Sequence, residues 1–228
     1  MTYEIPPQEL LDLSGKVAIV TGSGSGLGSG IAQRFAEAGA AVVVNFRSTS
    51  DGASQLVSRI EQAGGRALPV HADVTRRAEV ARLIEETVVA YGRLDIIINN
   101  AGIYPLSTVL DMSDEEWDAV IDANLRSTFL CTQLAARQMI AQKEAHEGEA
   151  GAIINIASIE AENPAPMHSH YDAAKSGVIM YTMASANELG AYGIRVNAVS
   201  PGLIWTEGIE DNWPDGVARW RKAAPLTR

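Results

Sequence analysis

A single α/β domain with a doubly wound parallel sheet is the fold that this sequence predicts. Short apolar segments alternate with segments of helical periodicity about six times along the chain, which is typical of a parallel sheet with helices on both faces. The first apolar segment runs directly into a glycine-rich loop and then a helix. No Pro-, Gly- or Ser-rich linker divides the 228 residues, so one domain is expected.

Composition and charge exclude several classes of protein. Hydrophobic residues make up 46% of the chain and charged residues 20%, as in a globular protein with a sizeable core. The net charge of -10 argues against nucleic acid or an anionic membrane surface as a partner. No apolar run approaches the roughly 20 residues that a membrane span needs. The single cysteine, Cys131, excludes an intrachain disulfide and fits the reducing cytoplasm.

The N-terminal segment is expected to carry no targeting signal. Residues 1–14 lack a basic region followed by an apolar stretch, and they are not rich in arginine. We expect them to form a surface arm ahead of a dinucleotide-binding catalytic domain at residues 15–228.

The first strand, loop and helix follow the order of a dinucleotide-binding unit. Residues 16–20 (KVAIV) are apolar, and Leu27, Ile31 and Phe35 then recur at helical spacing. The loop TGSGSGLG at 21–28 is placed to hold a pyrophosphate at the positive N-terminus of that helix. Its glycines permit a tight turn, close backbone approach and close helix packing, and they are Gly22, Gly26 and Gly28.

The middle of the chain continues the alternation of strands and helices. The second strand (AVVVN) is followed by a helix at 53–63. A third strand (RALPVH) leads to a helix at 76–91, which Asp73 or Thr75 is placed to cap. The segment LDIIINNAG then predicts a buried parallel strand. The sequence SDEE at 113–116 predicts a capping box that opens a long helical stretch. Asn124 falls inside this stretch, where asparagine is unfavourable and needs a reason.

Tyr171 and Lys175 are the first candidates for chemistry. They stand four residues apart in a segment of helical composition, so their side chains leave the same helical face. A tyrosine titrates near pH ~10, and an ammonium about one turn away favours the phenolate, which would lower that pKa toward neutral. Ser158 follows the apolar strand AIINIA and is placed to return to the same point. Taken alone, such a pair is far more often an ordinary amphipathic pair with a solvated lysine, and it gains meaning only beside other motifs.

Five motifs in register give the chain its resemblance to the short-chain dehydrogenase/reductase family. They are TGSGSGLG at 21–28, NNAG at 99–102, an asparagine within IDANLRSTF, a serine thirteen positions before YDAAK, and PGLIWT at 201–206. The match covers nearly the whole chain from about Gly15 onward. The resemblance implies a Rossmann-like fold, a nicotinamide dinucleotide cofactor and an alcohol or carbonyl substrate. It also implies a homo-oligomer, either a tetramer or a dimer.

The resemblance assigns roles to individual residues. Tyr171 exchanges a proton with the substrate oxygen, Lys175 lowers its pKa and holds ribose hydroxyls, Ser158 orients the oxygen, and Asn124 holds a relay water. Asp73 contacts the adenine. The cofactor-binding residues implied are Gly22, Ser25, Gly26, Leu27, Gly28, Phe46, Arg47, Ser48, Asp73, Val74, Asn100, Ala101, Gly102, Tyr171, Lys175, Pro201, Gly202, Ile204 and Thr206.

The end of the second strand indicates which dinucleotide binds. NAD-dependent relatives place a carboxylate there to accept a hydrogen bond from the ribose 2′-hydroxyl, whereas a basic residue accommodates the 2′-phosphate of NADP. Phe46 stands at the acidic position and Arg47 follows it, so NADP(H) is the preferred cofactor. Ser25, where many NADP-dependent relatives carry a basic residue, leaves NAD(H) possible.

The substrate is expected to be a small polyol, sugar or keto compound. Pro164, Pro166 and His170, between the serine and the tyrosine, resemble the glucose 1-dehydrogenase branch, while the overall similarity also fits 3-oxoacyl-ACP reductases. A non-catalytic dinucleotide sensor is the alternative of another class. The four histidines show no metal-ligand spacing among themselves or with Cys131, so no metal site is expected.

The C-terminal segment departs from the family pattern. Relatives continue beyond a PLTR-like turn into a further helix and a last strand, whereas this sequence ends at Arg228, so the sheet is expected to lack that strand. Residues 203–228 contain three of the four tryptophans and show no strong periodicity. They are expected either to form a mobile cover over the substrate or to pack onto the body or a second subunit.

Overall fold

The computed structural model describes residues 11–143, 150–206 and 208–224. The part of the predicted N-terminal arm before residue 11 lies outside this range. Six strands form one parallel sheet in the order β3-β2-β1-β4-β5-β6. Their bounds are β1 Val17–Val20, β2 Ala41–Phe46, β3 Arg66–His71, β4 Ile96–Asn99, β5 Gly151–Ile156 and β6 Ile194–Val199.

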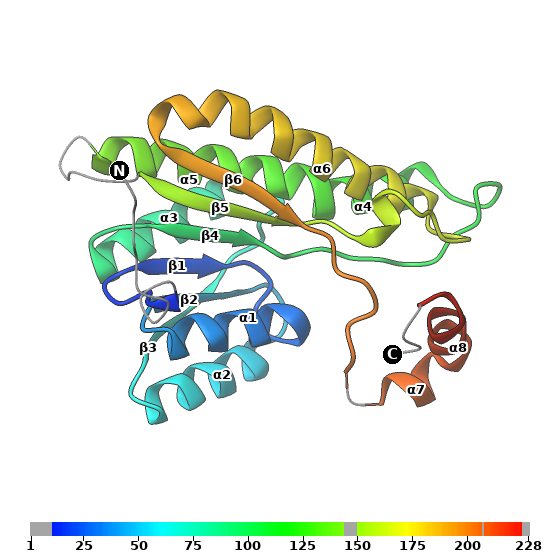
Figure 1. Ribbon diagram of the computed structural model, residues 1–228, viewed down its shortest axis with the longest axis horizontal. Helices are drawn as coiled ribbons and strands as arrows, with labels where there is room; N and C mark the ends of the chain where they lie inside the picture. Colours follow the sequence, from blue (N-terminus) through cyan, green and yellow to red (C-terminus); the bar gives the residue numbers. More distant parts are fainter. Residues whose placement is uncertain (1–10, 144–149, 207, 225–228) are drawn as a thin grey trace, which may run out of the picture.

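Helices cover both faces of the sheet (Figure 1). On one side lie α1 (Gly26–Glu37) and α2 (Ser50–Gln62), and on the other lie α3 (Arg77–Tyr91), α5 (Ser127–Lys143) and α6 (Ser169–Leu189). The prediction of a doubly wound, Rossmann-like α/β fold is confirmed. None of the helices within the described ranges is long and apolar enough to cross a membrane.

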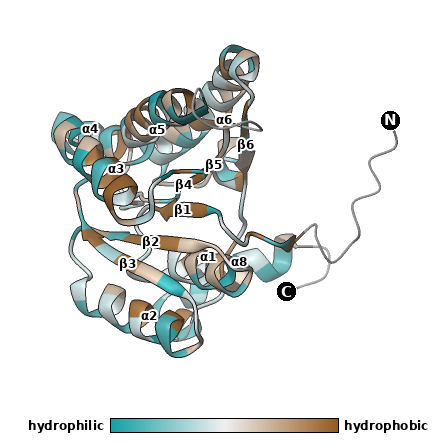
Figure 2. Cartoon of the chain, turned by 90° about the vertical axis from the view of Figure 1, so that its left-hand side faces the viewer, coloured by the Kyte–Doolittle hydropathy of each residue, from teal (hydrophilic) through white to brown (hydrophobic). Residues whose placement is uncertain are grey.

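The strands are apolar on both faces because each face packs on helices. In β1, Ile19 faces the core under α3 and α5, whereas Ala18 and Val20 face the core under α1 and α2. Figure 2 shows the resulting pattern, in which the hydrophobic colour concentrates on the central strands. A strand buried on both sides reads as a continuous apolar run, which is why β1 and β4 were recognisable in the sequence.

The long helical stretch around Asn124 is three segments. Helix α4 (Asp114–Ile121) begins at the predicted capping box, in which the Ser113 hydroxyl accepts from the Glu116 amide and the Glu116 carboxylate accepts from the Ser113 amide. A π-helical turn, η2 (Asp122–Arg126), follows and leads into α5. This turn is the local reason for an asparagine at position 124, because a π-bulge displaces its residue from the helical ladder.

The C-terminal segment contains structure that its periodicity did not reveal. A short helix α7 (Ile209–Asn212) precedes α8 (Pro214–Ala223), which begins with a proline at a position that tolerates one. A Cβ built on Gly202 would lie 2.3 Å from the Trp220 ring, so the indole rests directly on this glycine. That these helices cover a bound substrate, as expected from the sequence, stays a prediction.

Candidate active site

A cleft of about 870 Å³ opens at the carboxyl ends of the strands, where the connections from β1 and β4 run to opposite sides. All of the predicted catalytic and cofactor-binding residues line it. They are Gly22, Ser25, Gly26, Leu27, Gly28, Phe46, Arg47, Ser48, Asp73, Val74, Asn100, Ala101, Gly102, Asn124, Ser158, Tyr171, Lys175, Pro201, Gly202, Ile204 and Thr206.

The glycine-rich turn is held in place by polar side chains from other strands. The Asn45 side-chain oxygen accepts from the Gly22 amide at 3.1 Å, and its amide nitrogen donates to Val70 O and Ala72 O. Asn100 donates to the carbonyls of Thr21 and Gly22. A Cβ at Gly28 would lie 2.5 Å from the Asn100 amide nitrogen and 2.7 Å from Gly22 O, so this position requires glycine.

Asn45 is a site residue that sequence reasoning missed, because its position inside an apolar strand looked like a core position. It is 2% exposed. We expect Asn45→Ala to lower the free energy of unfolding by about 2 kcal/mol, since it leaves buried backbone groups without partners. We also expect it to weaken dinucleotide binding at least fivefold, because the Gly22 turn loses its support.

Urea unfolding and a fluorescence titration with NADPH test this expectation. Asn187→Ala, on the exposed side of α6, is the matched control and should change neither quantity. Unchanged stability and affinity in Asn45→Ala would contradict the role assigned to these hydrogen bonds.

The rim of the cleft at the end of β2 carries the basic residue predicted from the sequence. Arg47 Nη1 lies 4.0 Å from Asp73 Oδ2, and the Arg47 side chain is 56% exposed. Burial pushes the pKa of Asp73 upward, but hydrogen bonds from Thr75 and the nearby Arg47 hold it below its ordinary value. The alternative that Asp73 or Thr75 caps α3 is wrong: the N-cap is Arg76, and the Asp73 carboxylate instead accepts from the Thr75 amide and hydroxyl.

Asn124 and Lys175 meet at the inner end of the cleft. The Asn124 amide nitrogen donates to Ile103 O and Val120 O, which leaves its Oδ1 buried without a partner. A Cβ on Gly102 would lie 2.3 Å from this oxygen and 3.9 Å from Lys175 Nζ, so both groups face the same small space. An orphaned buried oxygen beside an ammonium is an arrangement that suits a bridging water.

Ser158 and Tyr171 come together as predicted. Ser158 is the N-cap of the short 3-10 helix η3 (Ile159–Ala161), and its hydroxyl is near enough to Tyr171 to act against the rise of the tyrosine pKa. The Tyr171 ring packs edge-on against Tyr104, with ring centroids 6.3 Å apart.

The expected electrostatics of the Tyr171 and Lys175 pair are corrected by the structure. Burial raises the pKa of Tyr171 above its ordinary value, which the Ser158 hydroxyl opposes and the carboxylates of Glu160 and Asp172 reinforce. Burial also lowers the pKa of Lys175 to about 8. Its Nζ donates to Ile156 O at 2.7 Å and lies 5.5 Å from the Tyr171 ring centroid. In the protein alone, desolvation favours the neutral form of both groups.

The sequence matches the family model for short chain dehydrogenases over residues 16–215. The chain belongs to the short-chain dehydrogenase family. It is 41% identical over 199 residues to a 3-oxoacyl-[acyl-carrier-protein] reductase of Synechocystis. This alignment covers 87% of this chain and 78% of the relative. It is 38% identical over 201 residues to glucose 1-dehydrogenase 2 of Bacillus subtilis, covering 88% of this chain and 76% of the relative.

Solved structures agree with this assignment. The crystal structure of a short-chain type dehydrogenase/reductase from Mycobacterium marinum matches with a TM-score of 0.88 at 40% identity, covering 96% of this chain and 85% of the other. The protein is therefore an NAD(P)-dependent oxidoreductase of this family.

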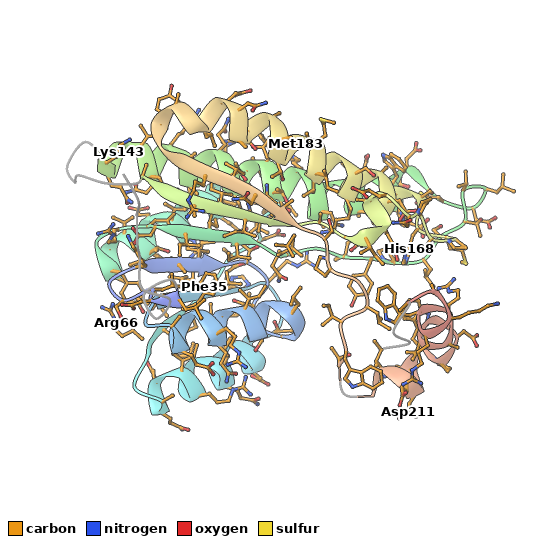
Figure 3. The ribbon with its side chains drawn as sticks, viewed as in Figure 1. Phe35, Arg66, Lys143, His168, Met183 and Asp211 are labelled. Carbon is orange, nitrogen blue, oxygen red and sulfur yellow. The ribbon has the colours of Figure 1, made fainter. Side chains whose placement is uncertain are left out.

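The short-chain dehydrogenase cleft also contains Glu160 and His168 beside Tyr171, for which the sequence showed no signal. Trp213, Arg219 and Trp220 line it from the C-terminal segment, whose tryptophans the sequence analysis placed over the substrate or on the body. Figure 3 shows His168 on the side of the body that faces α8. The spacing of the histidines relative to one another and to Cys131 gave no indication of a metal site. The fold nevertheless brings two carboxylates close to His168. Cys131 is buried in α5, and burial raises the pKa of its thiol to about 12, as suits a core residue.

Proposed function

We propose that the protein is an NADP(H)-preferring oxidoreductase that interconverts a secondary alcohol and a ketone, or a sugar lactol and a lactone. The observation that carries the proposal is the meeting of Asn124, Ser158, Tyr171 and Lys175 at one end of a dinucleotide-sized cleft. A sensor without turnover would not need these four groups together.

The residues divide into a binding set and a reacting set. The Gly22 to Gly28 loop and the N-terminus of α1 suit the pyrophosphate, and Asp73 suits the adenine. The bound dinucleotide supplies or accepts the hydride. Ser158 donates a hydrogen bond to the substrate oxygen, and Tyr171 gives its proton to that oxygen during reduction and takes it back during oxidation.

Burial decides the protonation state of these groups in the free protein. Because burial keeps Tyr171 protonated, the free protein is prepared to act as a proton donor, which favours reduction of a carbonyl at neutral pH. Lys175 and Asn124 face the space below Gly102, where a water would connect the tyrosine end of the site to solvent.

Preference for NADP(H) is proposed from Arg47. Its guanidinium is exposed at the rim, no carboxylate occupies position 46, and a planar guanidinium suits a phosphate. We expect Arg47→Ala to weaken NADPH binding about tenfold or more while changing NADH affinity less than twofold. Fluorescence titrations of both nucleotides measure this difference.

The control for this experiment is Arg137→Ala, which removes an exposed arginine from α5 outside the cleft. It should leave both affinities unchanged. Equal affinities for NADPH and NADH in the wild type, or a loss in Arg47→Ala that is the same for both, would sink the proposed preference.

The substrate is proposed to be a small hydroxylated compound such as a polyol or sugar. Glu160, Asn163 and His168 lie in the cleft near Tyr171, and carboxylate, amide and imidazole groups bond well to several hydroxyls at once. Trp213 and Trp220 add flat apolar faces. A 3-oxoacyl substrate is the second candidate, carried by the identity to the Synechocystis reductase. A panel of sugars, polyols and 3-oxoacyl thioesters, followed by NADPH oxidation, separates the two.

Self-association is proposed from the outer surface of α5 and α6. Met180 and Met183 are 64% and 57% exposed, and Phe129 is at 36%. Exposed apolar side chains on neighbouring helices are typical of subunit contacts. A molar mass of two or four chains, measured by light scattering, would support this proposal.

A further inference from the structure

Three side chains that the proposed reaction does not use as acids converge beside Tyr171. They are Glu160 from η3 and His168 and Asp172 from the start of α6. One nitrogen or oxygen atom from each lies within 4.8 Å of the others. His168 Nδ1 and Glu160 Oε2 are 2.8 Å apart. Two carboxylates and an imidazole are thereby held in one place by elements on both sides of the 162–167 loop.

Two of the three side chains in the cluster are buried, and the cluster is incompletely hydrogen-bonded. His168 is 7% exposed and Asp172 9%. The carboxylate of Asp172 is directed at Glu160 and His168, yet its Oδ1 has no hydrogen-bond partner, and neither does His168 Nε2. Buried polar atoms are normally paired, and unpaired ones call for a specific explanation such as an absent ion.

The cluster also places two carboxylates next to one imidazole. Adjacent carboxylates repel each other, and a cation bound between them would relieve that repulsion.

We propose that Glu160, His168 and Asp172 form a binding site for one divalent transition-metal cation. Carboxylate oxygens and an imidazole nitrogen are the donors that Zn²⁺ and Mn²⁺ accept. Donor atoms at about 2.1 Å from one ion lie roughly 3 to 3.5 Å apart. The Glu160–His168 contact of 2.8 Å would widen slightly, and any pair near the 4.8 Å limit of the cluster would have to close by about 1.5 Å when the ion binds.

The other charged and titratable groups facing the cluster leave this conclusion in place. Arg219 of α8 acts on His168 and opposes its protonation, and the Tyr171 ring packs against the imidazole. Lys175 bonds to Ile156 O instead. A bound cation would cancel the two carboxylates that raise the pKa of Tyr171, and so would make this tyrosine more acidic.

Calorimetric titration of the protein with Zn²⁺ at pH 7.5, without nucleotide or substrate, tests the site independently of the proposed reaction. One Zn²⁺ per chain with a dissociation constant in the micromolar range is expected. Glu160→Gln and Asp172→Asn keep the side-chain shapes and should each weaken binding at least tenfold. Glu162→Gln removes an exposed carboxylate two residues away and should not change it.

A pH series gives a second readout that needs no variant. Between pH 7.5 and 5.5 the wild-type affinity should fall at least tenfold, because protons compete for the carboxylates and the imidazole. Absence of stoichiometric binding at 100 µM Zn²⁺ would overturn the proposal. So would equal affinities in the wild type, Glu160→Gln and Asp172→Asn, because the ion would then bind elsewhere on the chain.

Discussion

Tyr171→Phe is expected to reduce turnover at least about 10³-fold while leaving NADPH affinity within about twofold. The substitution removes only the hydroxyl, which the proposed reaction uses as its proton donor and acceptor, and general acid–base groups contribute about 10² to 10⁴ in rate. The ring keeps its contacts with Tyr104 and His168, so the shape of the cleft is preserved.

Steady-state kinetics with the best ketone of the substrate panel, together with a fluorescence titration of NADPH, measure this separation. Tyr104→Phe is the matched control, because it removes a second tyrosine hydroxyl from the same cleft. Its turnover should stay within about threefold of wild type. Turnover in Tyr171→Phe within tenfold of wild type would show that another group transfers the proton.

Lys175→Met is expected to abolish measurable turnover and yet to stabilise the fold at neutral pH. Lys175 is 4% exposed, and burial lowers its pKa to about 8. The folded chain therefore holds a desolvated ammonium below pH 8, which costs up to about 3 kcal/mol relative to the unfolded chain. Methionine fills a similar volume without charge. The lost bond to Ile156 O offsets part of the gain, so a net stabilisation of about 1 to 2 kcal/mol is expected at pH 7.

The pH dependence of this difference follows from the direction of the shift. A lysine with a lowered folded pKa binds fewer protons in the native state, so its contribution to stability rises with pH between about 8 and 10.5. The advantage of Lys175→Met should therefore shrink across that window. Urea unfolding at pH 7 and pH 10 measures it, with the exposed Lys16→Met as control. A variant less stable than wild type at pH 7 would contradict the assigned cost of the buried charge.

The sequence was most informative where the local backbone conformation or burial requires a particular type of residue. The apolar runs of β1 and β4, the capping box at Ser113 and the glycines at 22 and 28 each satisfy a requirement of their own backbone. Because such local requirements are the same in many proteins, a single sequence is enough to recognise them. Helix α8 was missed because it is short and contains few apolar residues, of which Trp220 packs on Gly202 and lines the cleft.

Contacts between distant segments could not be read in this way. Asn45 supports a turn 23 residues earlier in the chain, and nothing in its strand distinguishes it from a core position. The pairing of Glu160 with His168 depends on how the intervening loop folds back.

The sequence by itself determined the order of the strands, the family, and most of the residues that line the dinucleotide part of the cleft, because these follow from local periodicity and motifs in register. Only the tertiary structure decided the protonation of the site. The pKa values of Tyr171, Lys175 and Asp172 depend on burial, and those of Tyr171 and Asp172 also on charges from other elements. The spacing of two residues along a helix gives no information about either.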